Sequence, residues 1–60
     1  MKKIVVFDYS TGIVHVLDYD ENIFEEVEDF FDHANTELGL PLTTSQTHWM
    51  IVDELNIKVW

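Results

Sequence analysis

The sequence predicts a small α+β protein with the element order ββαβ(β), in which the last strand is the least regular. Two segments rich in β-branched and aromatic residues open the chain, one amphipathic helical segment follows, and strand-like segments close it. A helix between strands is typical of an antiparallel or mixed sheet with the helix packed on one face. Sixty residues suffice for one domain, so we expect residues 1–60 to form a single compact unit with three to four strands.

The first two strands are expected at residues 3–9 and 13–19. The intervening Ser10-Thr11-Gly12 suits a three-residue hairpin loop that ends on a glycine in the left-handed conformation. This loop implies the cross-strand pairs Tyr9 with Ile13, Phe7 with His15, Val5 with Leu17, and Lys3 with Tyr19.

In this register the two faces of the hairpin differ in character. One face is small and aliphatic, with Ile4, Val6, Val14 and Val16. We place the helix on this face because phenylalanine rings pack well over short branched side chains, although the sequence leaves the opposite choice open. The other face is then exposed, and it is either an ordinary wet sheet surface or an interface formed by Phe7, Tyr9, His15 and Tyr19.

An amphipathic helix is predicted from Asn22 to Leu38. Its apolar residues recur with helical spacing and fall within one sector: Ile23, Phe24, Val27, Phe30, Phe31, Ala34 and Leu38. Asn22 is a favourable N-cap, and Glu25 three residues later completes a capping box. Gly39 and Pro41 are natural stop signals at the other end.

The closing strands are predicted at residues 47–52 and 56–60, joined by a turn at residues 53–56. A single bent strand over the same stretch is the alternative. The sequence does not determine whether the third strand pairs with the first or with the second.

Charge is the strongest compositional feature, because twelve acidic residues stand against three lysines and give a formal net charge of −9. Such a field repels phosphate backbones and anionic lipids, so we expect neither direct nucleic-acid binding nor membrane binding. The chain has no cysteine and no apolar run long enough to span a bilayer. These features predict a soluble cytoplasmic protein.

Acidic residues concentrate on the outer face of the predicted helix, where Glu21, Glu25, Glu28, Asp29 and Asp32 have no lysine or arginine among them. Like charges at helical spacing repel one another, so a helix selected for stability alone would include basic residues. The row either keeps the protein soluble or binds a basic protein. A line of carboxylates can imitate a run of phosphates, which suggests an inhibitor or DNA-mimicking regulator of a nucleic-acid-binding protein.

No motif in the chain indicates catalysis or a cofactor. The spacing of Asp18, Asp20, Asn22 and Asp29 resembles a calcium loop, but Ile23 replaces the glycine that its sharp turn requires. The three histidines have no fixed nucleophile partner, and no glycine-rich phosphate loop exists. We therefore expect no catalytic residues, no metal site and no cofactor.

The sequence thus favours a non-enzymatic interaction protein that binds a basic partner through its acidic helix. The alternative is a structural homodimer that associates through its exposed sheet face.

Overall fold

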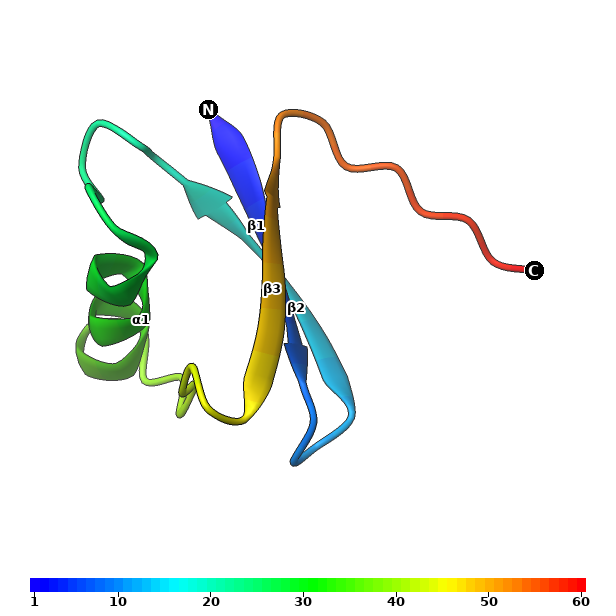
Figure 1. Ribbon diagram of the computed structural model, residues 1–60, viewed down its shortest axis with the longest axis horizontal. Helices are drawn as coiled ribbons and strands as arrows, with labels where there is room; N and C mark the ends of the chain where they lie inside the picture. Colours follow the sequence, from blue (N-terminus) through cyan, green and yellow to red (C-terminus); the bar gives the residue numbers. More distant parts are fainter.

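In the computed structural model, which describes residues 1–60, the chain forms a three-stranded antiparallel sheet and one helix, an α+β fold (Figure 1). The strands are β1 (Lys2–Asp8), β2 (Ile13–Tyr19) and β3 (Thr47–Val52), and helix α1 (Val27–Thr36) lies between β2 and β3 in the sequence. Strand β1 is central, because the strand order is β2-β1-β3 and both pairings are antiparallel.

The hairpin register differs by one residue from the predicted one. Asp8 pairs with Ile13 and Val6 pairs with His15, so the loop contains four residues, 9–12, instead of three. The cause is the Asp8 carboxylate, which accepts hydrogen bonds from the backbone N–H of Ser10 at 3.0 Å and from its Oγ at 2.7 Å. Gly12, at φ +72°, donates its N–H to the Asp8 carbonyl and closes the loop.

These hydrogen bonds also lower the pKa of the Asp8 carboxyl below its usual value, since the Ser10 hydroxyl stabilises the ionised form.

The one-residue shift changes which side chains share a face, because side chains alternate along a strand. The prediction that the helix covers a face formed by Ile4, Val6, Val14 and Val16 is therefore wrong. The helix covers Ile4 and Val6 of β1 together with Leu17 and Tyr19 of β2, whereas Val14 and Val16 lie on the opposite side of the sheet.

The core lies between the helix and this side of the sheet. It is built from Ile4, Val6, Tyr19, Phe30, Phe31, Ala34 and Leu42, all of which are buried. The aromatic rings of Tyr19, Phe24 and Phe30 lie 5.5–5.7 Å apart, and Phe31 contacts Trp49 of β3 at 5.2 Å. These edge-to-face and tilted ring pairs stabilise the core beyond the area that they bury.

Helix α1 is shorter than predicted, and it begins at Val27 instead of Asn22. The Asp20 side chain accepts the N–H of Asn22 at 3.0 Å, and the Asp20 carbonyl accepts the N–H groups of Ile23 and Phe24. A helix capped by Asn22 would direct the N–H of Glu26 to the Asn22 carbonyl, but this N–H is donated to the Asp29 carboxylate instead. Glu26 is the N-cap, and the Asp29 carboxylate accepts its backbone N–H at 3.3 Å.

At the other end the helix stops at Thr36, before the predicted Leu38. Glu37 donates its N–H to the carbonyl of His33, and Leu40 donates its N–H to the carbonyl of Ala34. Gly39, at φ +67°, allows the chain to turn back toward β3.

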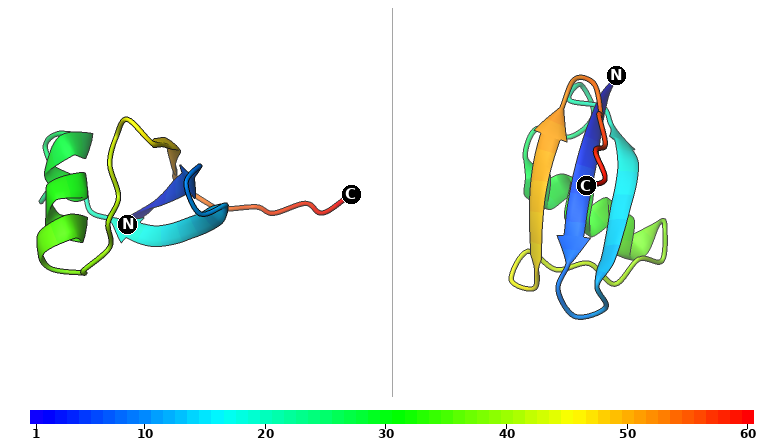
Figure 2. Two further views of the ribbon diagram at one scale, coloured as in Figure 1. Left: turned by 90° about the horizontal axis from the view of Figure 1, so that it is seen from below. Right: turned by 90° about the vertical axis from the view of Figure 1, so that its right-hand side faces the viewer.

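The predicted fourth strand does not form. Residues 55–60 leave the end of β3 as an extended segment without sheet pairing, on the side of the sheet opposite the helix (Figures 1 and 2). In the right-hand view of Figure 2 the three strands face the viewer, the helix lies behind them, and the segment projects forward.

Candidate functional site

The five acidic residues predicted as a partner-binding row are all exposed, but they do not share one helix. Glu28, Asp29 and Asp32 belong to α1, whereas Glu21 and Glu25 lie in the turns before it. The five carboxylates therefore do not form one continuous line. Glu28, Asp29 and Asp32 form a group on the helix, and Glu25 lies just before the helix begins.

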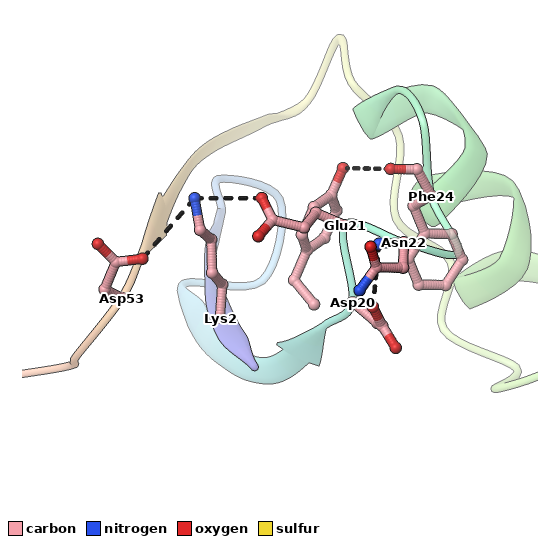
Figure 3. A network of polar contacts seen from close by, with 7 residues as sticks. Lys2, Asp20, Glu21, Asn22, Phe24 and Asp53 are labelled. Atoms are coloured by element: carbon pink, nitrogen blue, oxygen red, sulfur yellow. Dashed lines mark hydrogen bonds and ion pairs between the residues drawn. The ribbon is translucent and has the colours of Figure 1, made fainter.

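Glu21 is part of a separate charge cluster around Lys2 (Figure 3). The Lys2 Nζ lies 3.3 Å from a Glu21 carboxylate oxygen and 3.7 Å from one of Asp53. The hydrogen bond and negative charge of Glu21, assisted by the charge of Asp53, raise the pKa of Lys2. This cluster ties the start of β1 to the residue that follows β3, from which the C-terminal segment departs.

None of the three lysines pairs with another acid of the row. Lys2 is paired as described, Lys3 pairs with Asp18, and Lys58 lies 5.8 Å from the centre of the Trp60 ring. No ion pair involves Glu25, Glu28, Asp29 or Asp32. Asp29 nevertheless has a structural role, because it accepts the N–H of the N-cap residue.

The four residues predicted as a sheet-face interface do not form one surface. Phe7 lies on the side of the sheet away from the helix, and Tyr9 lies in the hairpin loop. Tyr19 is only 5% exposed, beneath the helix, and His15 is half-buried on that same side. The one-residue change of register explains the error, since it moves His15 and Tyr19 to the face opposite Phe7.

Tyr19 is a core residue in the structure. Its hydroxyl donates a hydrogen bond to the Phe24 carbonyl at 3.4 Å. Burial raises the pKa of this phenol, and the negative charges of Asp29, Glu21 and Glu28 raise it further.

The surface opposite the helix is apolar, and we call it the open face. It carries alternate residues of all three strands: Lys3, Val5, Phe7, Val14, Val16, Asp18, His48, Met50 and Val52. The centre of the open face is apolar. Lys3 and Asp18 lie at one end of this face, where they pair with each other. Phe7, Val14, Val16 and Met50 are all exposed.

A groove of about 390 Å³ runs between the open face and the first residues of the C-terminal segment. Both the sheet and the segment line it, with the residues Val5, Phe7, Val14, Val16, Met50, Leu55, Asn56, Ile57 and Lys58. Sequence reasoning missed Val14, Val16 and Met50 as surface residues. The signal available was Asp8-x-Ser10, which is typical of a side-chain-capped turn and favours the longer loop.

The motif that resembles a calcium loop has other roles in the structure. Asp18 pairs with Lys3, Asp20 caps the turn before the helix, and Asp29 accepts the N–H of the N-cap residue Glu26. No group of three or more His, Asp or Glu side chains is placed to hold a metal ion.

The histidines are also dispersed. His33 packs against Phe24 with ring centres 5.4 Å apart, and His48 lies 6.4 Å from Tyr9.

Comparisons with protein-family models, curated protein sequences and solved structures find no match to this chain. The helix of the structure is too short and too polar to cross a membrane.

Proposed function

We propose that the chain is a non-enzymatic interaction protein whose open face binds a second copy of itself. The observation that carries this proposal is the exposed apolar surface opposite the helix, which involves all three strands. A contiguous apolar patch on a small protein usually marks an interaction site. Domains of this size also have a thin margin of stability and often gain from association.

The distribution of charge supports association through this face. Seven of the acidic residues lie between Glu21 and Glu37, in or around the helix on the other side of the sheet. Two copies that meet through their open faces keep these groups apart, so the net charge of −9 opposes the dimer only weakly at physiological ionic strength.

A charge placed in the middle of the open face tests the proposal. Val16→Glu would put a carboxylate among apolar groups at the interface, which is costly without a partner for the charge. Light scattering after size-exclusion chromatography should show a dimer for the unmodified chain and a monomer for this variant. Ile23→Glu is the matched control, since Ile23 is exposed outside the open face, and it should remain dimeric. A Val16→Glu variant with unchanged mass would contradict the proposal.

A second candidate function is binding of a basic protein through the carboxylates of α1. It is supported by the exposed Glu25, Glu28 and Asp32, which have no ion-pair partner in their own chain. An inhibitor or DNA-mimicking regulator is its most concrete form, because these groups can occupy a site that binds phosphates. The two functions are compatible, since they use opposite sides of the molecule.

The charge-reversed variant Glu28→Lys with Asp32→Lys tests this second function, and it leaves the capping residue Asp29 intact. The control reverses Glu37 and Glu54, which changes the net charge equally. A native basic partner should be captured from lysate by the unmodified chain and the control at low salt, released at high salt, and not captured by the helix variant. Equal capture by the helix variant and the control would refute this function.

A further inference from the structure

The C-terminal segment, residues 55–60, is largely apolar, yet only Leu55 is half-buried and residues 56–60 are exposed. Ile57, Val59 and Trp60 are 74%, 93% and 104% exposed, respectively. Leu55, Ile57 and Val59 alternate with Asn56 and Lys58, which is the pattern of an extended strand with one apolar side. The segment therefore presents a second apolar surface next to the open face.

We propose that two copies of the chain exchange these segments, so that the segment of each copy fills the groove on the open face of the other. This inference rests on the proposed dimer and names the residues that complete its interface. Each copy both gives and receives a segment, which is the reciprocal arrangement of a two-fold symmetric dimer.

The solvent-accessible area of the single chain is consistent with an interface that a second copy would cover. The chain exposes 4565 Å², whereas a compact monomer of 7.1 kDa exposes roughly 4,100 Å². Seven apolar residues of the open face and the segment are at least 39% exposed: Phe7, Val14, Val16, Met50, Ile57, Val59 and Trp60. Taking full residue areas of roughly 150–250 Å², these residues expose roughly 800–900 Å² in total, which matches the roughly 800 Å² that each partner contributes to a stable complex.

The geometry of the segment fits the receiving groove. Five extended residues, 56–60, span about 16 Å. The two outer strands of a three-stranded sheet lie about 10 Å apart, so one segment can cross the whole open face. The segment leaves its own sheet on the side of the open face and projects away from it (Figure 2), which directs it toward a copy that faces this side.

The Lys2 cluster lies next to the start of the segment. The Asp53 carboxylate lies 3.7 Å from the Lys2 Nζ, so an ion pair connects β1 to the residue at which the chain leaves β3. On the receiving side, Lys3 and Asp18 are already paired. The incoming apolar residues therefore meet no unpaired charge at that end of the open face.

Trp60 fluorescence distinguishes the occupants of the groove. In a Trp49→Phe variant, Trp60 is the only tryptophan, and phenylalanine keeps an aromatic ring against Phe31. Exposed tryptophan emits at long wavelength, and burial in an apolar groove shifts the emission to shorter wavelength. We expect this shift to grow with protein concentration in parallel with dimer mass measured by sedimentation. Adding Val16→Glu should abolish both changes, whereas adding Ile23→Glu should leave both in place.

Three outcomes would overturn the exchange. A concentration-independent blue shift in a monomer would mean that the segment folds onto its own open face. A dimer in which Trp60 emission stays at long wavelength would mean that the faces pair without the segment, and the proposed function would still stand. A monomer with exposed Trp60 at every concentration would refute both the exchange and the proposed dimer.

Discussion

Phe30→Ala is the substitution that tests most sharply how the helix packs on the sheet. Phe30 is 1% exposed, and its ring lies 5.7 Å from Tyr19, 5.5 Å from Phe24 and 5.9 Å from Phe31. Truncating a buried phenylalanine to alanine lowers the free energy of unfolding by about 3–5 kcal/mol. Because the variant also loses contacts with three aromatic rings, we expect a loss near the upper end of this range.

That loss is large for a chain of this size. At about 0.05–0.15 kcal/mol per residue, sixty residues provide a free energy of unfolding of about 3–9 kcal/mol. We therefore expect Phe30→Ala to be largely unfolded at 25 °C or to melt more than about 15 °C below the unmodified chain. Phe30→Leu keeps most of the apolar volume and should cost about 1–2 kcal/mol, which keeps the transition measurable.

Ile23→Ala is the matched control. A helix that began at Asn22 would turn Ile23 toward the core, and truncation would then cost about 2–5 kcal/mol. In the structure Ile23 is 69% exposed in a turn, so the cost should stay within about 0.5 kcal/mol. Urea denaturation followed by far-UV circular dichroism measures all three variants. If Ile23→Ala lost as much stability as Phe30→Leu, the packing of the helix on the sheet described above would be refuted.

Three further predictions concern the hairpin loop and the helix cap. Because the pKa of Asp8 is lowered in the folded chain, its contribution to stability is present above the unfolded pKa and disappears as the pH falls through the lower folded pKa. The stability difference between the unmodified chain and Asp8→Asn should therefore shrink below about pH 4, and a difference that is constant with pH would contradict this. Gly12→Ala should cost about 1–2 kcal/mol in urea titrations, from its positive φ alone, because no heavy atom lies within 4 Å of the added Cβ; a neutral effect would show that the loop has another conformation. Asp29→Ala should cost about 0.5–1.5 kcal/mol, because the N–H of the N-cap residue Glu26 loses its hydrogen bond. Asp32→Ala should change stability by less than about 0.5 kcal/mol, and equal losses of stability in the two variants would refute the role of Asp29.

The sequence was sufficient for the fold class and for the approximate positions of β1, β2 and β3, because the strand segments are separated by clear turn residues. It was insufficient for the hairpin register. That register depends on whether Asp8 ends the pairing or Tyr9 continues it, and two hydrogen bonds to Ser10 decide the outcome. Periodicity cannot detect such a local competition, yet its result moves every side chain of one strand to the other face.

The helix start illustrates the same limitation. Asn22 and Glu25 satisfy the capping rules, but the chain forms a turn after Asp20, and the N–H of Glu26 is donated to the Asp29 carboxylate instead of the Asn22 carbonyl. Ile23 and Phe24 fit the helical period by coincidence of spacing, and only Phe24 packs against the core. The acidic group was correctly expected at the surface, whereas the pairing of Glu21 with Lys2 required the fold that brings β1 near the end of β2.

The alternation of the strand residues predicted an exposed apolar face that contains Phe7, but the predicted register placed Val14 and Val16 on the covered face. With Val14 and Val16 on the open face, the sheet and the C-terminal segment line one apolar groove.

Sedimentation equilibrium of the unmodified chain tests the central claim, that the open face is an interface between two copies. We expect the apparent mass to rise with concentration from 7.1 kDa toward twice that value, about 14 kDa. The dimer should persist at high salt, because the contact between the copies is apolar. A mass that stays at 7.1 kDa at every concentration would contradict the claim.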